Sequence, residues 1–204
     1  MDFNIQATNW DTDKRIKRGE IIAAEIMKSI DIKGNYNALE FGCGTGILSF
    51  NMKNKFKHIT LADISEGMIE KLNHKIQESK VENMTSVRID ITQDTELIKE
   101  RFDVIYSSMA LHHILDVEST LKHLYEMLNK EGYICIVELV EEDGSFHKSE
   151  KDFNGHNGFN QEKLKNLLKE IGFKNVEWNT FYKDVKDVEG MEVNYSLFLM
   201  VGRK

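Results

Sequence analysis

The sequence has no proline and only two cysteines among its 204 residues. Without proline, the ends of helices must be inferred from glycine and asparagine. Cys43 and Cys135 lie far apart in the chain, and their spacing fits neither a disulfide framework nor a metal-binding motif. We therefore expect a reducing compartment and no metal ion.

Long hydrophobic runs and an excess of positive charge are also missing. No apolar stretch approaches the roughly 20 residues that span a bilayer, and the first ten residues lack the basic and apolar regions of a secretion signal. We expect a cytoplasmic protein with no membrane partner. The net charge of -7 does not favour a nucleic-acid substrate, because phosphate backbones attract basic surfaces.

Short apolar segments alternate with amphipathic ones from residue 37 onward. This alternation is typical of a parallel sheet covered by helices on both faces. Two later segments, 175–185 and 191–204, are joined by a short link with Gly190 and predict an antiparallel hairpin. The five preceding strands are expected over 37–42, 58–63, 85–90, 102–108 and 133–140.

Polar residues at the starts of amphipathic segments predict helix caps. Asp11 or Thr12 precedes a helix that runs to Ile30, and Ser65 and Asn160 precede two others. A helix over 116–130 is expected to stop at Gly132. A short helical piece is expected over 95–100.

The segment 141–160 interrupts the alternation, because it is polar and contains several glycines. Loops of this length within compact domains are usually functional or disordered. The segment follows the fifth strand, and its phenylalanines need a surface to cover. We expect it to close over the mouth of a binding site.

Three glycines alternate with small residues in EFGCGTG, which begins at Glu40 and follows the first strand. Such a turn lies at the sheet edge where open α/β folds bind ligands. The dinucleotide fingerprint G-x-G-x-x-G does not match, because Gly46 comes one residue too early. This spacing opposes a nicotinamide-dependent oxidoreductase, and no P-loop Gly-Lys-Ser/Thr is present in the turn.

The glycine turn resembles the first motif of the class I S-adenosylmethionine-dependent methyltransferases, and other features agree. HITLAD ends in Asp63, TSVRID ends in Asp90, and FDVIYSSMALHHI resembles the fourth motif in its His-His version. The resemblance covers about residues 35–204. It implies an α/β, Rossmann-like doubly wound sheet of seven strands, mostly parallel with an antiparallel last strand. Residues 1–34 resemble the N-terminal helical lid of a subset of the family.

The resemblance also implies which residues bind the cofactor, S-adenosyl-L-methionine, and its product S-adenosyl-L-homocysteine. Asp63 would bind the ribose, Asp90 would receive the adenine amino group, and Ser107 would lie beneath the sulfonium. Cys43 is a small filler in this motif, and no base beside it indicates a nucleophile. The implied cofactor contacts are Glu40, Gly42, Cys43, Gly44, Asp63, Ile64, Met68, Asp90, Ile91 and Ser107, with Trp10 and Arg18 as candidates from the lid.

Four histidines are candidates for the acceptor pocket. His112 and His113 follow the fourth strand and suit an acceptor-positioning group or a base near neutral pH, although a capping or packing role is an equal alternative. His147 and His156 lie in the 141–160 segment and are either solvated or directed at the acceptor.

The resulting hypothesis is an enzyme that transfers a methyl group from S-adenosylmethionine to a small-molecule acceptor by direct in-line displacement. An alternative is a catalytically silent S-adenosylmethionine-binding module that acts through partners. The sequence leaves open the acceptor, the methylated atom, the use of a general base, and whether the protein is a monomer or a homodimer.

Overall fold

The computed structural model describes residues 3–93, 98–150 and 152–204. The helices are α1 (Phe3–Gln6), α2 (Asp13–Ser29), α3 (Ile47–Met52), α4 (Glu66–Glu78), α5 (Val117–Met127) and α6 (Gln161–Ile171). The strands are β1 (Asn37–Phe41), β2 (His58–Asp63), β3 (Met84–Arg88), β4 (Phe102–Ser108), β5 (Leu128–Leu139), β6 (Lys174–Val188) and β7 (Met191–Arg203). Short 3-10 turns include η1 (Ala7–Asn9), η2 (Lys53–Lys55), η4 (Leu111–His113) and η5 (Ser145–His147).

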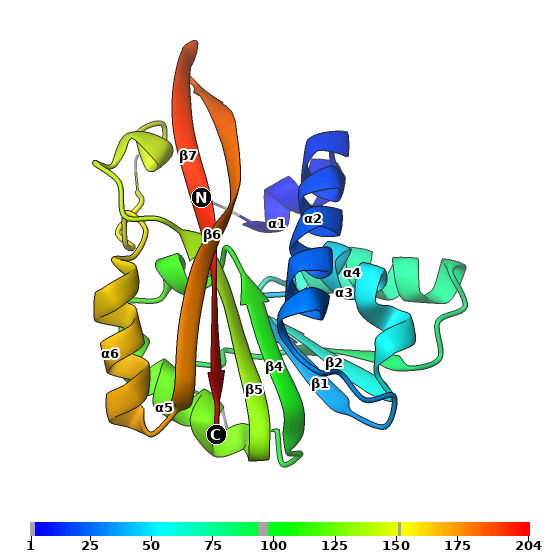
Figure 1. The fold of residues 1–204 in the computed structure, drawn as a ribbon. Coiled ribbons are helices and arrows are strands. Elements are labelled where there is room, and N and C mark those ends of the chain that lie inside the picture. Colours follow the sequence, from blue (N-terminus) through cyan, green and yellow to red (C-terminus); the bar gives the residue numbers. More distant parts are fainter. Residues whose placement is uncertain (1–2, 94–97, 151) are drawn as a thin grey trace.

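The strands form one seven-stranded sheet in the order β3-β2-β1-β4-β5-β7-β6 (Figure 1). Strands β1 to β5 pair in parallel, whereas β7 runs antiparallel to both of its neighbours. The order reverses between β1 and β4, which is the switch point where ligands bind in open α/β sheets. This architecture confirms the doubly wound, mostly parallel sheet with an antiparallel last strand.

Two apolar cores lie on opposite faces of the sheet, because alternate side chains of each strand point to opposite faces. On one face, Ile26 of α2, Met52 of α3 and Leu72 of α4 belong to the same buried cluster. On the other face, Leu121 of α5 and Leu168 of α6 pack in a second cluster. Figure 1 shows α5 and α6 on one side of the sheet and α2, α3 and α4 on the other.

Side-chain caps begin the helices where the sequence predicts them. The side chain of Thr12 accepts a hydrogen bond from the backbone N–H of Arg15 and caps α2. Ser65 and Asn160 cap α4 and α6 in the same way. Each cap satisfies a backbone donor that the first turn of a helix leaves without a partner.

Two regions differ from the sequence-based expectation: the boundary between α5 and β5, and residues 95–100. Helix α5 ends at Met127, and β5 begins at Leu128 instead of residue 133, because Leu128 already pairs with Phe102 across a bulge in the ladder. Residues 95–97 of the expected helical piece lie outside the described residues, and residues 98–100 have no regular structure. Within the described ranges, no helix is long and apolar enough to cross a membrane.

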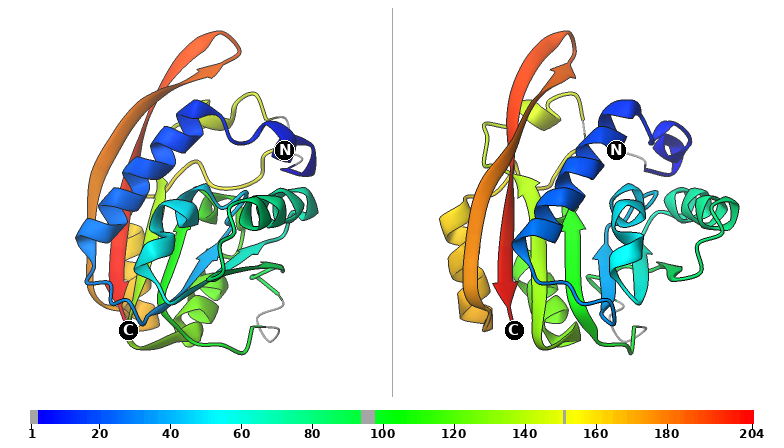
Figure 2. Two further views of the ribbon diagram at one scale, coloured as in Figure 1. Left: turned by 90° about the vertical axis from the view of Figure 1, so that its right-hand side faces the viewer. Right: turned by 45° about the vertical axis from the view of Figure 1, so that its right-hand side comes forward.

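The hairpin of β6 and β7 extends beyond the rest of the sheet and rises on the side where the N-terminal segment lies (Figure 2). Helix α2 runs beside this hairpin, and the structure records contacts between α2 and β7. The loop after β5 returns to the sheet at Phe159, which forms a bridge with Val140. The hairpin, α2 and this loop thus surround the carboxyl ends of the parallel strands.

Candidate functional site

The glycine turn between β1 and α3 forms the base of the site. Gly42, Gly44 and Gly46 all have positive φ angles, of 63°, 52° and 76°, which favour glycine over other residues. The backbone N–H of Gly44 donates to Asp63 Oδ2 at 2.7 Å, and the N–H of Ser65 donates to Asp63 Oδ1 at 2.8 Å. Asp63 therefore ties the turn to the end of β2.

Asp63 retains acceptor capacity toward a ligand, because each oxygen of a carboxylate can accept more than one hydrogen bond. Burial raises the pKa of Asp63, whereas its backbone donors act in the opposite direction. A neighbouring cation would favour its charged form.

Glu40 is a second acidic group at this end of the site, and its side chain is buried. The Ser49 hydroxyl donates to Glu40 Oε2 and lies 2.6 Å from the hydroxyl of Tyr106. Burial and the nearby Asp63 together raise the pKa of Glu40 to about 8, although the hydrogen bonds from Ser49 act in the opposite direction. Glu40 consequently holds a proton at neutral pH until a cation approaches it.

A cavity of about 1050 Å³ opens above the glycine turn. It brings together residues of α2, the ends of β1 to β4, η4, η5 and the β6–β7 hairpin. The sequence-predicted residues that line it are Trp10, Arg18, Glu40, Gly42, Cys43, Gly44, Asp63, Ile64, Met68, Asp90, Ile91, His112, His113 and His147. Among the described residues, Ser107 and His156 are the two predicted positions that do not line it.

Ser107 lies in the sheet and is almost fully buried, whereas the next residue, Ser108, lines the cavity. His156 fixes the loop after β5 to the segment after β4. Its backbone N–H donates to His112 O at 2.7 Å, and its Nε2 lies 2.9 Å from Ile114 O. These placements do not support a direct ligand contact for Ser107 or His156.

Side chains that follow β2 and β3 line one part of the cavity, which we call the slot. Met68 and Ile91 contribute buried apolar side chains, whereas Ile64 is 60% exposed. Asp90 Oδ1 accepts hydrogen bonds from the backbone N–H and hydroxyl of Thr92, at 2.9 and 2.6 Å. The Asp90 carboxylate is thus oriented at the edge of this slot.

The N-terminal segment lies over the glycine turn. A Cβ placed on Gly44 would lie 3.5 Å from Trp10 Nε1, so the indole faces the turn closely. The guanidinium of Arg15 stacks on Trp10 at 4.0 Å, and Arg18 donates to the Tyr195 hydroxyl at 3.3 Å. These contacts place cationic side chains of α2 along the wall of the cavity.

His112 is held by a buried carboxylate at the far end of the cavity from β3. Its Nδ1 lies 2.7 Å from Glu138 Oε2, and its backbone N–H donates to Glu138 Oε1 at 3.3 Å. Burial opposes the charge of Glu138, but His112 and backbone donors outweigh it and lower the pKa of Glu138. A charged Glu138 accepts a hydrogen bond from the Nδ1–H of His112. The Nε2 atom of His112 then carries the unshared electron pair of the ring.

His113 and His147 lie beside His112, and both also line the cavity. Burial and the neighbouring His112 lower the pKa of His113 to about 4 and that of His147 to about 3. Both rings are therefore neutral at physiological pH, and each keeps an electron pair on one ring nitrogen. The ring of His147 stacks on Phe153, with centroids 3.8 Å apart.

Several cavity residues could not be identified from the sequence. Tyr195, Lys186 and Glu150 come from β7, β6 and the loop after β5, far from the glycine turn in the chain. Lys186 Nζ donates to Phe146 O at 2.7 Å and to Glu150 Oε1 at 3.3 Å. No local motif marks these positions, because only the hairpin and the loop bring them to the site.

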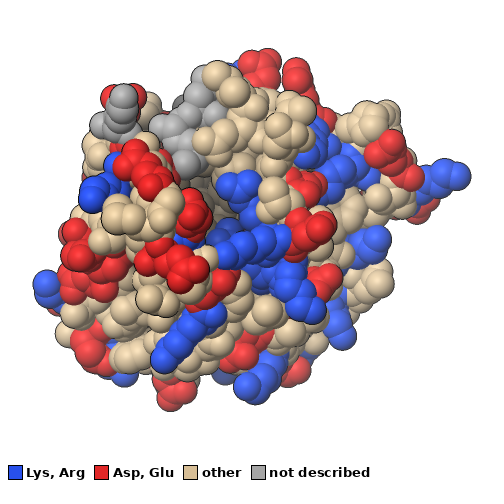
Figure 3. All heavy atoms as spheres, turned by 90° about the horizontal axis from the view of Figure 1, so that it is seen from above, with Lys and Arg blue, Asp and Glu red and all other residues tan. Residues whose placement is uncertain are grey.

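Charged side chains of both signs surround this end of the molecule, and Lys and Arg gather near the centre of the face in Figure 3. Lys14, Arg15, Arg18 and Lys186 are the basic residues that line the cavity. Glu40 and Asp63 lie at the glycine turn instead. The cavity therefore presents charged side chains of both signs to a ligand.

Cys43 does not have the properties of a nucleophile. Its thiol is buried, and its Sγ lies 3.6 Å from Gly44 O. Burial, with Glu40 and Asp63 nearby, raises the pKa of Cys43 well above its usual value, so the reactive thiolate is disfavoured.

The chain belongs to a family of methyltransferase domains, whose model matches residues 15–178. An uncharacterized methyltransferase of Schizosaccharomyces pombe is 25% identical over 71% of this chain and 56% of its own length. A malonyl-[acyl-carrier protein] O-methyltransferase of Acetivibrio thermocellus is 28% identical over 66% of this chain and 47% of its own. The chain thus spans about half the length of these curated relatives.

Relatives and solved structures extend the likeness. A ribosomal RNA small subunit methyltransferase C of Actinobacillus pleuropneumoniae is 29% identical over 58% of this chain and 36% of its own. The phosphoethanolamine N-methyltransferase 2 of Haemonchus contortus, solved with S-adenosyl-L-methionine, superposes with a TM-score of 0.72 at 14% identity, covering 90% of this chain and 52% of its own. At this identity the superposition supports the fold, which is that of class I methyltransferases.

Proposed function

We propose that this protein transfers a methyl group from S-adenosylmethionine to a small-molecule acceptor. The observation that carries the proposal is a single cavity lined by two different groups of side chains. The glycine turn, Asp63 and Glu40 form one group, which we call the acidic end, and three histidines form the other. The cavity volume of about 1050 Å³ is at the upper end of the range of roughly 300–1,000 Å³ that is usual for small-molecule sites.

The acidic end fits the cationic cofactor. Asp63 has free acceptor positions for the two ribose hydroxyls, and Glu40 would receive the amino group of the methionine portion. The slot lined by Met68 and Ile91 would hold the adenine, with Asp90 at its edge. Gly44 has no Cβ, and a side chain there would meet the Trp10 indole at 3.5 Å.

The other end fits the acceptor. In the reaction, the acceptor's electron pair forms the new bond to the methyl carbon while the sulfur–methyl bond breaks. The bond electrons remain on sulfur, which yields neutral S-adenosyl-L-homocysteine. Any proton that the acceptor loses would pass to water, because the lowered pKa values of His113 and His147 make them poor proton acceptors. The protein's main contribution is alignment of the two reactants and exclusion of water.

Enclosure of the cavity favours a small acceptor over a macromolecule. Helix α2 borders it on one side through Arg18, and the loop after β5 borders it on the other through Phe146 and His147. We propose that residues 3–34 act as a lid on the methyltransferase domain that follows. The relatives are named for acceptors as different as malonyl-[acyl-carrier protein] and ribosomal RNA, so the acceptor class rests on how α2 and this loop border the cavity.

The test is to titrate the full chain with S-adenosylmethionine and then to follow S-adenosylhomocysteine formation across a panel of metabolites. We expect cofactor binding, no useful binding of NAD, and methylated product with a small molecule. Cofactor binding without turnover on any metabolite would instead support a silent binding module. Turnover on RNA alone would contradict the small-molecule acceptor.

Cofactor affinity should rise as the pH is raised from about 6 to about 8, because the cofactor's amino group binds the Glu40 carboxylate better than the neutral acid. Below its pKa of about 8, Glu40 must release a proton when the cofactor binds. Calorimetry in buffers of different ionisation enthalpy measures this proton. His113 and His147 do not titrate in the same range, since their pKa values are about 4 and about 3.

Glu40→Gln is the matched control for this pH dependence, because glutamine keeps the shape of the side chain and cannot release the proton. The variant should bind the cofactor more weakly and release no proton. Equal proton release by the variant and the unmodified protein would show that another group titrates.

Replacing residues 144–150 with a short glycine–serine link should reduce turnover about 100-fold while leaving cofactor affinity within about threefold. This segment includes Phe146, His147 and Glu150, which line the acceptor end, whereas Asp63 and Gly44 lie outside it. The control is Lys148→Ala, since Lys148 is exposed on the same loop. Equal losses of turnover and cofactor affinity would mean that the loop supports the cofactor end.

A further inference from the structure

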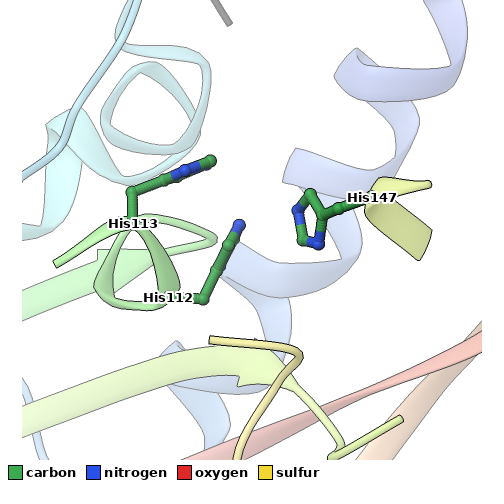
Figure 4. Close-up of side chains that lie close together, drawn as sticks. All are labelled: His112, His113 and His147. Atoms are coloured by element: carbon green, nitrogen blue, oxygen red, sulfur yellow. The ribbon is translucent and has the colours of Figure 1, made fainter. Parts of the chain in front are cut away.

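Three histidines from two separate segments meet at the acceptor end of the cavity. His112 and His113 belong to η4, and His147 belongs to η5 in the loop after β5. One ring nitrogen of each lies within 4.8 Å of those of the other two. Figure 4 shows the three side chains directed toward one another from these two turns.

The hydrogen bond of His112 resembles those that support metal ligands. Nδ1 of His112 is bound to Glu138 Oε2 at 2.7 Å, and both side chains are almost fully buried. Ligating histidines usually donate their second ring nitrogen to a carboxylate or a carbonyl, which fixes the ring and the tautomer. The Glu138 carboxylate therefore leaves the Nε2 electron pair of His112 available at the cavity.

His147 provides a second, independent observation. Its Nδ1 is buried and has no hydrogen-bond partner among the described residues. Buried polar atoms nearly always have a partner, so an orphaned ring nitrogen needs an explanation such as an ion or a ligand. Stacking on Phe153, with ring planes 5° apart, holds the imidazole in its plane.

We propose that His112, His113 and His147 bind a divalent first-row transition-metal ion such as Zn²⁺, with a coordination position left open to the cavity. Three imidazoles, each binding through a nitrogen electron pair, form a ligand set suited to zinc, cobalt or nickel. The proposal goes beyond the proposed function and does not depend on it, because metal binding can be measured without a methyl acceptor.

The geometry requires a modest contraction of the cluster. Tetrahedral zinc with bonds of about 2.0–2.1 Å places its ligand nitrogens roughly 3.3 Å apart, whereas these atoms lie within 4.8 Å of one another. His112 is fixed by Glu138, so the adjustment falls to His113 and to the η5 turn that carries His147. In the described structure, Glu138 bonds to His112 and not to the rings of His113 and His147.

Lys186 carries a positive charge near the cluster, and this charge opposes the binding of a metal cation. Its ammonium group donates to Phe146 O and to Glu150 Oε1. The other oxygen, Oε2 of Glu150, is buried and without a hydrogen-bond partner within the described part of the chain. The Glu150 carboxylate pairs with this ammonium, but Lys186 still contributes to the lowered pKa values of His113 and His147, so the cluster binds a metal cation against this charge.

The sequence gives no indication of this site. We expected no metal ion because the cysteines do not cluster with histidines and no ligand spacing is visible along the chain. The adjacent pair His112 and His113 is not a metal motif by itself. Only the loop after β5 brings His147 to the pair.

The experiment uses the full chain without an added histidine tag, stripped with a chelator and titrated with ZnCl₂ by calorimetry. We expect one ion per chain with a dissociation constant of about 1 µM or below. Titration with CoCl₂ should give visible absorption bands that report nitrogen ligands around the ion. His113→Ala and His147→Ala should each weaken binding by at least about tenfold.

His74→Ala is the matched control, because His74 is exposed on α4 and paired with Glu78. It should bind zinc as the unmodified protein does. Circular dichroism confirms that each variant is folded. His112 is left unchanged because its removal would leave the buried Glu138 carboxylate without its side-chain partner. Binding that is absent in the folded protein, or that survives in both His113→Ala and His147→Ala, would overturn the proposal.

Discussion

Asp63→Ala should weaken S-adenosylmethionine binding by about 30-fold or more, equivalent to about 2 kcal/mol. The substitution removes the acceptors expected for the ribose hydroxyls, and charge-assisted hydrogen bonds are stronger than neutral ones. It also releases the N–H groups of Gly44 and Ser65, which the Asp63 carboxylate binds in the structure. The glycine turn therefore loses its tie to β2 together with the ligand contact.

Calorimetric titration of the cofactor measures this loss. Glu66→Ala is the matched control, because Glu66 is an exposed carboxylate nearby on α4 that pairs with Arg88 at 3.3 Å. Its removal should leave cofactor affinity unchanged. If a folded Asp63→Ala variant bound the cofactor as tightly as the unmodified protein, the cofactor would lie elsewhere.

Glu138→Ala should lower the free energy of unfolding by about 3–5 kcal/mol, because several buried donors lose their acceptor and each unsatisfied donor costs roughly 1–3 kcal/mol. Glu138 and His112 are almost fully buried, and their side chains meet at 2.7 Å. Without the carboxylate, the Nδ1 proton of His112 and two backbone N–H groups lose their acceptor. Urea denaturation followed by circular dichroism measures the change.

The pH dependence of stability has a defined sign at this pair. The pKa of Glu138 is lowered in the folded protein, so its contribution is present above its ordinary pKa and is lost as the pH falls through the folded value. The difference in free energy of unfolding between the unmodified protein and Glu138→Ala should therefore be smaller in acid than at neutral pH.

The exposed pair of Glu118 and Lys122 on α5 gives the comparison for Glu138→Ala. Glu118→Ala should change stability by at most about 0.5 kcal/mol, because solvent screens surface pairs. Similar losses in both variants would mean that the buried position of Glu138 contributes nothing.

The sequence alone predicted most of the fold and the residues of the glycine turn that line the cavity. Apolar runs, glycine stops and polar caps are local signals, and β2 and β4 appear over the predicted residues. Gly42, Gly44 and Asp63 belong to a motif confined to one strand, its turn and the next strand. Their geometry follows from the crossover between adjacent parallel strands, so a local pattern was sufficient.

Other features depended on pairing or packing between distant segments. Leu128 joins β5 because it meets Phe102 across the sheet, although the preceding helical pattern continues past it. Lys186 and Tyr195 reach the cavity because the hairpin extends beyond the sheet. His147 approaches His112 and His113 because its loop returns over the strand ends, and no pattern along the chain encodes that distance.

The sequence by itself therefore determined the order of elements, the glycine turn and the acidic groups that follow the strands, since these depend on neighbours in the chain. The tertiary structure decided the acceptor end. There, the ring nitrogens of three histidines and the Glu138 carboxylate meet only after the loop and the sheet have packed. Burial in that packed state lowers the pKa values of His113 and His147, whereas hydrogen bonds and His112 lower the pKa of Glu138 despite its burial.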